Sequence, residues 1–232
     1  MTKPLGQKAY GSIPHLSGSR LGPKDYSACP GHEQILTVKA RKGDTIVVEE
    51  KLDGSCCAVA KVNSEIVPLS RAGYLAGTSP YRQHHLFAAW TYARQDHFLA
   101  ALQEGQRLVG EWVLQAHGTR YDVEHADRLF RPFDLMVGTK RLGRNAVFQA
   151  AARCGLLPVP LLHVGGPLPV AEALKLLPDG SEGAVWRCEN ERFGVETLAK
   201  FVRHDKVDGA LLPEISGHAE VWNFDPVQAV AA

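Results

Sequence analysis

The stretch Glu-Glu-Lys-Leu-Asp-Gly at residues 49–54 places one lysine among three carboxylates, just before a glycine. It is flanked by residues 44–48 and 55–60, two runs of β-branched and small apolar residues that are typical of strands. An Asp-Gly pair between two such runs indicates a tight turn. The sequence therefore predicts a hairpin with Lys51 at its mouth, where the glycine lets a ligand approach closely. The alternative is an ordinary surface turn that carries a solvated lysine.

The composition is that of an ordinary globular protein, with 45% hydrophobic and 22% charged residues, which argues against wholesale disorder. At 232 residues the chain can bury a substantial core, as one large domain or two small ones. The formal net charge is +1, so no global basic field points to nucleic acid. The net charge does not exclude a local basic groove that binds nucleic acid.

The five cysteines are odd in number and include no Cys-x-x-Cys pair, and the adjacent Cys56 and Cys57 would face opposite sides of a strand. This usage disfavours a zinc site or a disulfide framework and favours a reducing compartment. Residues 1–10 lack the apolar core of a signal peptide, and no apolar run is long enough to span a bilayer. We therefore expect a cytoplasmic protein without a membrane partner.

The distribution of apolar residues predicts the elements of an α+β chain. Strands are predicted over residues 35–39, 45–51, 55–62, 66–69, 107–114, 129–137, 181–188 and 193–202. Helices are predicted over residues 81–103, 145–154 and 170–177. The first four strands are interpreted as an antiparallel meander, and the proline-interrupted residues 156–164 as an edge strand or connector.

Both ends of the chain are expected to be irregular. Residues 1–33 are rich in glycine, proline, serine and charge, and residues 226–232 are expected to fray. Within the first segment, residues 13–20 mix apolar and polar side chains, which fits a packed loop or the wall of a pocket. Composition favours a surface loop instead.

Several strands carry a polar residue that needs an explanation. Glu111 interrupts an apolar run, and a charge buried there without a partner costs several kcal/mol. Either Glu111 faces water or it binds a ligand, and the adjacent Gly110 favours a pocket. Arg71, between a strand and a glycine, is a solvated loop charge or a phosphate ligand. Phe133, next to Asp134, is plain core or a stacking platform.

A later Glu-Gly pair, in Ser-Glu-Gly at residues 181–183, opens another strand. In the strand that follows, alternation places Lys200 and Val202 on one face, with Arg203 on the other. The histidines of the long predicted helix, His84, His85 and His97, make a metal site conceivable, but solvated or capping histidines are the more common outcome.

In their order and character these sites resemble the collinear motifs of the covalent nucleotidyltransferases: ATP-dependent DNA ligases, RNA ligases and GTP-dependent mRNA capping enzymes. The match runs from about residue 45 to residue 206. Residues 14–20 and 200–203 are similar to those of small bacterial and phage RNA ligase-domain proteins. DNA ligases and capping enzymes usually have Lys-x-Lys and a C-terminal OB-fold domain. Here Val202 replaces the second lysine, and too few residues follow for an OB fold.

The resemblance implies that Lys51 forms a phosphoramide with the α-phosphate of ATP and releases pyrophosphate. A lysine with the ordinary pKa of about 10.4 is protonated at neutral pH and cannot attack. Lys200 is the candidate neighbouring cation that would lower the pKa of Lys51 and stabilise charge on the α-phosphate. Glu182 is the candidate ligand of a magnesium or manganese ion.

The same resemblance assigns further roles around the nucleotide. Glu111 would accept hydrogen bonds from the ribose hydroxyls, Phe133 would stack on adenine, and Arg71 would contact ribose or phosphate. Asp53 would orient Lys51 or the water shell of the metal. Nucleotide contacts are also expected from the remaining motif residues Glu50, Glu182, Lys200 and Arg203, the last as a partial substitute for the missing second lysine.

The implied fold is α+β, with two antiparallel sheets and flanking helices around a nucleotide groove, as one adenylyltransferase domain over residues 1–225. The implied partner is RNA, as a nicked duplex, an RNA–DNA hybrid, a broken tRNA or single strands, with a separate end-healing partner left open. Two alternatives stay open. One is a nucleotidyltransferase that uses GTP or modifies ends without sealing, and the other is an inactive module that binds RNA ends.

Overall fold

The computed structural model describes residues 2–192 and 194–231. It has the α+β architecture that the sequence predicts, with two antiparallel sheets and flanking helices. The chain divides into two compact units that are each built from separate segments. The five-stranded unit comprises Met1–Gly11, Asp53–Pro158 and Asp208–Ala232, and the four-stranded unit comprises Ser12–Leu52 and Val159–Val207.

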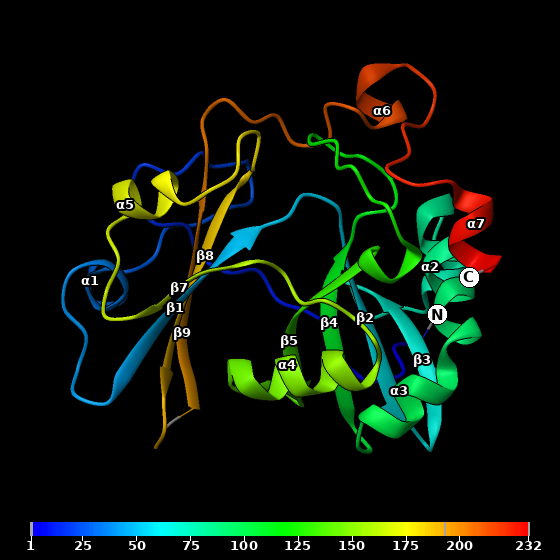
Figure 1. The fold of residues 1–232 in the computed structure, drawn as a ribbon, viewed down its shortest axis with the longest axis horizontal. Helices are drawn as coiled ribbons and strands as arrows, with labels where there is room; N and C mark the ends of the chain where they lie inside the picture. The colour runs from blue at the N-terminus through cyan, green and yellow to red at the C-terminus, as the bar shows by residue number, and fades with distance from the viewer. Residues whose placement is uncertain (1, 193, 232) are drawn as a thin grey trace. The chain divides into compact units, whose positions relative to one another are not determined.

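The five-stranded unit contains one sheet in the order β3-β2-β4-β5-β6. Its strands are β2 (Ser55–Val62), β3 (Glu65–Ser70), β4 (Gln106–Trp112), β5 (Phe130–Val137) and β6 (Lys140–Arg141). Its helices are η1 (Ala76–Thr78), α2 (Arg82–Ala93), α3 (Gln95–Ala101), η2 (Ala126–Arg128), α4 (Arg144–Arg153), α6 (Pro213–Ser216) and α7 (Pro226–Ala231). Helix α7 packs beside α2 (Figure 1).

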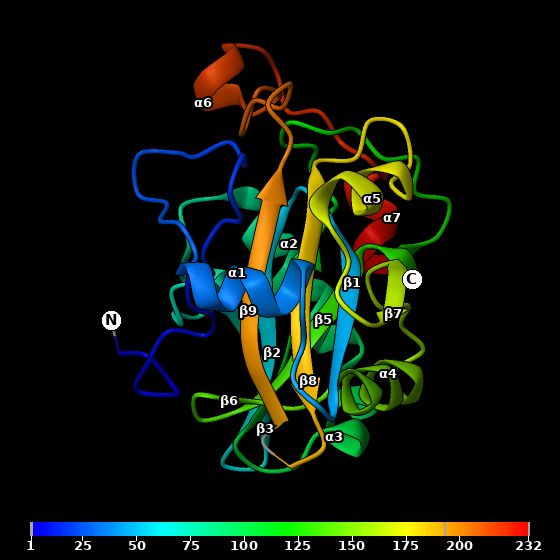
Figure 2. The same ribbon diagram turned by 90° about the vertical axis from the view of Figure 1, so that its left-hand side faces the viewer.

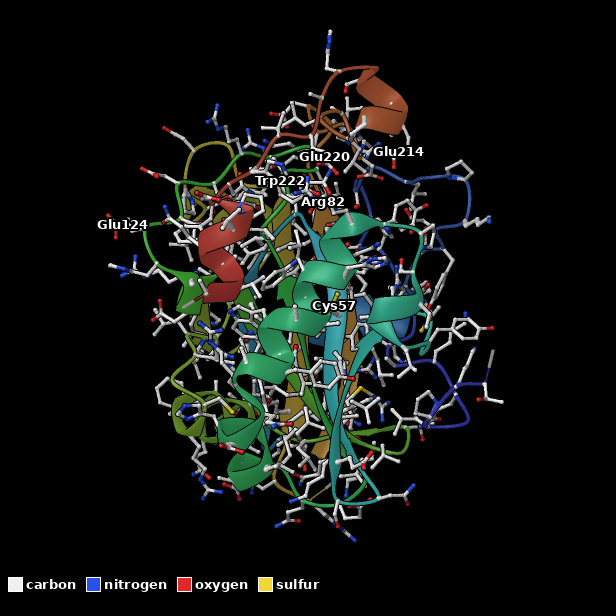
Figure 3. The ribbon with its side chains drawn as sticks, turned by 90° about the vertical axis from the view of Figure 1, so that its right-hand side faces the viewer. Cys57, Arg82, Glu124, Glu214, Glu220 and Trp222 are labelled. Carbon is white, nitrogen blue, oxygen red and sulfur yellow. The ribbon has the colours of Figure 1, made fainter. Side chains whose placement is uncertain are left out.

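Aromatic side chains form the centre of the five-stranded unit. The rings of Phe87 and Trp90 on α2 lie 5.4 Å from the Trp112 ring on β4, centroid to centroid. Phe130 on β5 lies 5.2 Å from Phe87. Helix α2 runs across the strands over Cys57 of β2 (Figure 3), which is fully buried. The apolar face of the helix and the apolar face of the sheet therefore share one core.

The four-stranded unit contains a sheet in the order β7-β1-β8-β9. Its strands are β1 (Asp44–Lys51), β7 (Leu161–Gly165), β8 (Gly183–Asn190) and β9 (Gly194–Val202). Its helices are α1 (Pro30–Thr37) and α5 (Val170–Lys175). Helix α1 lies across β8 and β9 (Figure 2), where Leu36 packs with Trp186 in a second core cluster.

The sequence predicts a hairpin around the Asp-Gly pair, and this prediction is wrong. Strand β1 pairs with β7 and β8, whereas β2 pairs with β3 and β4, so the two flanking strands belong to different sheets. The expected meander survives only as the β2–β3 hairpin. Its turn residues Asn63 and Ser64 have positive φ of 52° and 64°, which suits a two-residue turn that matches strand twist.

The strand predicted over residues 35–39 is also wrong, because residues 30–37 form helix α1. Pro30 occupies the first turn, where its missing N–H costs nothing, and Leu36 is fully buried. The hydroxyl of Thr37 donates to the Glu33 carbonyl, 2.8 Å away, within the same helix. The strand was predicted because residues 35–38 at the end of this helix include three β-branched residues, which are typical of strands.

Two further boundaries differ from prediction. The helix predicted over residues 81–103 breaks at Arg94, whose φ of –115° and ψ of 17° separate α2 from α3.

Residues 226–231, expected to fray, form helix α7. Asp225 accepts a hydrogen bond from the Val227 amide at 2.8 Å, and Ala229 is fully buried. The edge strand expected within residues 156–164 is confirmed as β7.

No helix in the described part of the chain is long and apolar enough to cross a membrane.

Gly110 allows β4 and β5 to approach closely at an irregularity in their register, between Val109 and Gly110. A Cβ atom at this position would lie 2.7 Å from the Arg131 carbonyl oxygen and 2.7 Å from the Phe130 ring. Backbone and a fully buried ring cannot move aside cheaply. Packing between β4 and β5 therefore accounts for the glycine at position 110, beside Glu111.

Gly110→Ala should lower the free energy of unfolding by about 1–3 kcal/mol because the added methyl group overpacks this site. The change is measured as a shift of the urea midpoint followed by tryptophan fluorescence. Gly11→Ala, whose added Cβ would have no neighbour within 4 Å, is the control and should leave the midpoint nearly unchanged. An unchanged midpoint for Gly110→Ala would contradict the close approach.

Candidate active site

Lys51 ends β1, an inner strand of the four-stranded sheet, and lies opposite Gly183 of β8. Its ammonium nitrogen is 2.5 Å from the Glu182 Oε2 atom. The Glu182 side chain is only 5% exposed and the Lys51 side chain 22%. The alternative of a solvated lysine on a surface turn does not hold, because Lys51 is largely buried against a buried carboxylate.

Gly183 fixes the position of Glu182 relative to β9. An added Cβ atom at Gly183 would collide with the carbonyl oxygen of Phe201. The Arg203 amide donates to the Glu182 carbonyl at 3.0 Å, which ties the residue before β8 to the residue after β9. The Glu-Gly pair therefore holds its carboxylate at the junction of two strands.

Lys200 lies on β9 opposite Val185, and its ammonium nitrogen is 3.4 Å from Asp25 Oδ1. Burial, followed by the positive charge of Lys51, lowers the pKa of Lys200, while Asp25 opposes this shift. The structure thus brings Lys51, Glu182 and Lys200 together in one unit.

The segment before α1 adds residues that the sequence did not single out individually. His15 and Leu16 are 1% and 2% exposed, so the surface loop favoured for residues 13–20 is wrong. His15 Nε2 lies 3.2 Å from Asp25 Oδ2, so both residues join the network around Lys200. For His15 the available signals were the compact mixture of apolar and polar residues and the resemblance of residues 14–20 to RNA ligase-domain proteins.

Glu50 and Arg203 have other partners within the four-stranded unit. Glu50 is buried, and its Oε1 atom accepts a hydrogen bond from the Ser181 hydroxyl at 2.6 Å. Alternation along β1 puts Glu50 on the opposite face from Lys51. The Arg203 guanidinium pairs with Asp205 at 3.1 Å. Their predicted nucleotide contacts stay predictions.

Asp53 and Glu111 lie in the five-stranded unit and organise the chain after Lys51. One Asp53 oxygen accepts from the Gly118 amide at 2.8 Å, and the Asp53 amide donates to the Tyr121 hydroxyl at 2.8 Å. Glu111 Oε1 accepts from the Gly54 amide at 3.1 Å. These bonds hold the Asp-Gly pair against β4 and the loop after it.

Arg71 and Phe133 both contact the N-terminal segment of the same unit. The exposed Arg71 side chain donates to the Gly11 carbonyl at 3.3 Å. The half-buried Phe133 ring meets the Tyr10 ring edge-on, with centroids 5.2 Å apart. The neighbouring Asp134 is fully buried and pairs with Arg141 at 3.1 Å, which explains this charge within a strand.

His84 on α2 forms hydrogen bonds to two hydroxyl groups, whereas His85 bonds to the Ser79 carbonyl oxygen. His84 lies 3.1 Å from the Ser55 Oγ atom and 2.6 Å from the Ser79 Oγ atom. Burial, followed by the charges of His117 and His85, lowers the pKa of His84 to about 4. His84 is therefore neutral at neutral pH and joins the start of β2 to the segment before α2.

Another possible ligand cluster lies in the four-stranded unit, where atoms of Asp44, Cys188 and Glu196 are within 4.8 Å of one another. Arg41 forms ion pairs with both carboxylates. Burial, together with the charge of Asp44, raises the pKa of Cys188 to about 11, so the thiol stays protonated. The cluster is a salt-bridge network rather than a good metal site.

The family model for RNA ligase matches residues 44–202, which is more than half of the sequence and includes Lys51, Glu182 and Lys200. The chain belongs to the RNA ligase family. Among proteins with curated descriptions, none matches this member of the family.

Solved structures of RNA ligases share the fold. An archaeal ATP-dependent RNA ligase is 20% identical with a TM-score of 0.51, and the match covers 83% of this chain and 48% of the archaeal one. A mutant RNA ligase from Naegleria gruberi with AMP and Mn is 15% identical with a TM-score of 0.51, covering 91% of this chain and 63% of that one. The chain thus spans about half to two-thirds of these relatives.

The low pKa of His84 makes stability depend on pH. Because the folded-state pKa of about 4 lies below the ordinary value of 6.5, the contribution of neutral His84 is fully present above pH 6.5. It is lost as the pH falls from 6.5 to 4, by up to about 3 kcal/mol of unfolding free energy. The unfolding free energy is measured by urea titration at pH 7 and at pH 5. Its decrease between these two pH values should be smaller for His84→Gln than for wild type.

The exposed His218 offers the matched control. His218→Gln should keep the pH dependence of the wild type. Equal pH dependence in the His84 variant and the wild type would show that His84 is not held neutral.

Proposed function

We propose that this protein is an ATP-dependent RNA ligase that adenylylates itself on Lys51. The observation that carries the proposal is the pairing of Lys51 with the buried Glu182 in a member of the RNA ligase family. Lys200, whose pKa the Lys51 charge lowers, supplies a second cation in the same unit. The motif residues therefore support covalent nucleotide transfer rather than simple binding.

In the first step the neutral Lys51 amine attacks the α-phosphorus of ATP. A nitrogen–phosphorus bond forms, the bond to the pyrophosphate oxygen breaks, and the attacking nitrogen releases one proton to solvent. The ion pair with Glu182 favours the ammonium form of Lys51, which has no lone pair for attack. The ammonium must therefore lose a proton to solvent before attack, and the nearby positive charge of Lys200 favours this loss.

Lys200 would stabilise the charge that develops on the α-phosphate oxygens. An ammonium in a partly buried site stabilises a nearby negative charge more strongly than one in water does, because the local dielectric constant is lower. Its side chain is 17% exposed and held by Asp25, so little reorganisation is needed when the charge appears. This is the contribution expected of a preorganised electrostatic group.

A divalent ion would be held by Glu182, since carboxylate oxygens are the ligands that magnesium and manganese prefer. When bound, the ion would offset charge on the phosphate oxygens. The donor set fits, because Glu182 is a buried carboxylate next to the nucleophile. The mutant Naegleria gruberi ligase with AMP and Mn supports the same choice of nucleotide and metal here.

Residues of the five-stranded unit are proposed to recognise the nucleoside. Glu111 is partly exposed at the end of β4 and would accept from the ribose hydroxyls. Phe133 is partly exposed on β5 and would stack on adenine. The exposed Arg71 would contact ribose or phosphate. Asp53 holds the Gly118 amide, which suggests that it orders the motif loop in addition to any role toward the metal.

The adenylate would then pass to an RNA 5′-phosphate, and a 3′-hydroxyl would attack to seal the strand and release AMP. A second candidate function is a nucleotidyltransferase of the same superfamily that does not seal. The formal net charge of +1 favours it, because proteins that hold nucleic acid alone usually present a basic surface.

Wild-type protein incubated with α-labelled ATP and Mg²⁺ or Mn²⁺ should retain label after denaturing electrophoresis. Lys51→Arg keeps the charge but should lose more than 99% of the label, because guanidinium cannot act as the nucleophile. Lys42→Arg, a change of an exposed lysine in the same unit, should label like wild type. Retained label in the Lys51 variant, or none in wild type freed of bound AMP, would refute the covalent mechanism.

Sealing is measured separately on a nicked RNA duplex with a labelled 5′-phosphate at the nick. A ligase should convert the labelled strand to the joined length with ATP but not with GTP. Normal self-labelling with ATP, without joining of nicked duplexes, RNA–DNA hybrids or single strands, would favour the non-sealing candidate. Label from GTP instead of ATP would favour a GTP-using enzyme.

A further inference from the structure

Asp25 lies beside the proposed active-site cation in the four-stranded unit. Its Oδ1 atom is 3.4 Å from Lys200 Nζ, and both side chains are largely buried, at 27% and 17% exposure. Asp25 belongs to the segment before α1, more than 170 residues away in sequence from its partner. Contact over such a separation requires that the segment be held in place.

Main-chain bonds hold the segment along β9. The Lys200 amide donates to the Pro14 carbonyl at 2.9 Å, and the Leu16 amide donates to the Lys200 carbonyl at 2.8 Å. Two residues further on, the Val202 amide donates to the Ser19 hydroxyl at 2.9 Å. The backbone of Lys200 is thus fixed by the same segment that supplies Asp25.

The Asp25 carboxylate is itself positioned. The Gly22 amide donates to Oδ2 at 2.9 Å, and His15 Nε2 lies 3.2 Å from the same atom. The other ring nitrogen of His15 is 2.6 Å from the Ser19 hydroxyl, so the ring is held at both ends. Burial would raise the pKa of Asp25, but the Gly22 hydrogen bond and the Lys200 charge outweigh it and lower the pKa to about 2.

We propose that Asp25 is a positioning residue for Lys200, which it holds as an ammonium and keeps from competing with Lys51 for Glu182. This inference rests on the proposed function. The structure pairs Lys51 with Glu182 and Lys200 with Asp25. Separate pairs leave Glu182 next to the nucleophile and keep the second cation in a fixed place.

The groups that face Lys200 come from three parts of the unit. Lys51 on β1 disfavours its charge, whereas Asp25 from the N-terminal segment and Glu182 before β8 favour it. His15 of the N-terminal segment also faces Lys200, and burial followed by the Lys200 charge lowers the pKa of His15, which favours its neutral form. With Asp25 neutralised, the Glu182 carboxylate would still favour the Lys200 ammonium. Lys200 would then draw toward Glu182 and loosen its pair with Lys51.

Asp25→Asn keeps the shape of the side chain and removes its charge. The first readout is independent of nucleotide: competitive acetylation of Lys200 across pH, followed by mass spectrometry, gives the midpoint of its titration. The midpoint should move to lower pH in Asp25→Asn, since a favourable charge is lost, and return toward wild type in Asp25→Glu. Glu33→Gln is the matched control, because Glu33 holds the same segment through the Ser17 hydroxyl at 2.8 Å.

The second readout is the single-turnover rate of self-adenylylation at saturating ATP. Asp25→Asn should slow it by roughly 10- to 100-fold, as expected for a misplaced electrostatic group, and Asp25→Glu should recover part of the rate. Glu33→Gln should match wild type in both readouts. If Asp25→Asn does not fold, Asp25→Ser, which replaces the carboxylate with a neutral hydroxyl that can still accept a hydrogen bond, is measured in its place with the same expectations.

An unchanged Lys200 midpoint and an unchanged rate in the Asp25 variants would overturn the inference. Wild-type protein that takes no label would instead refute the proposed function, and the acetylation midpoint would still decide whether Asp25 holds Lys200. A lowered rate with an unchanged midpoint, equal in Asp25→Asn and Glu33→Gln, would show a merely structural role and count against the proposal.

Discussion

A carboxylate that is almost fully buried must be paired if it is to stay charged, and in this protein the partner of Glu182 is Lys51. Around this pair the four-stranded sheet has a specific construction. The close approach of β8 and β9 at Gly183 fixes the position of Glu182. The inner position of β1 in the sheet fixes the position of Lys51. The same pair favours the protonated lysine, whereas the proposed attack on ATP needs the neutral amine.

Local pattern was enough to predict most individual strands and helices. The apolar runs that became β4 and β5 and the helical spacing that became α4 are properties of short segments. The pairing of β1 was not predictable in this way. Its partner β8 lies about 130 residues later, and the Asp-Gly pair between β1 and β2 gave a stronger local signal for a hairpin that does not exist.

The candidate site shows the same division. Lys51, Glu182 and Lys200 were found because a family motif marks each of them, and the structure brings them into one unit. Asp25 and His15 were not predicted as site residues, since single polar residues in a loop-rich segment carry no periodic signal. Helix α1 was missed because propensity favoured a strand, whereas Pro30 in its first turn and the burial of Leu36 decided the outcome.

The order in which the parts leave the ribosome gives the pairing of β1 a biological meaning. Strand β1 is synthesised before its neighbours β7 and β8, which lie at residues 161–190, and Lys200 comes later still. A nascent chain that has not yet reached residue 182 therefore carries Lys51 without Glu182 and Lys200. Under the proposed chemistry, such a chain cannot consume ATP, and competence for reaction arrives only once residue 200 has been added.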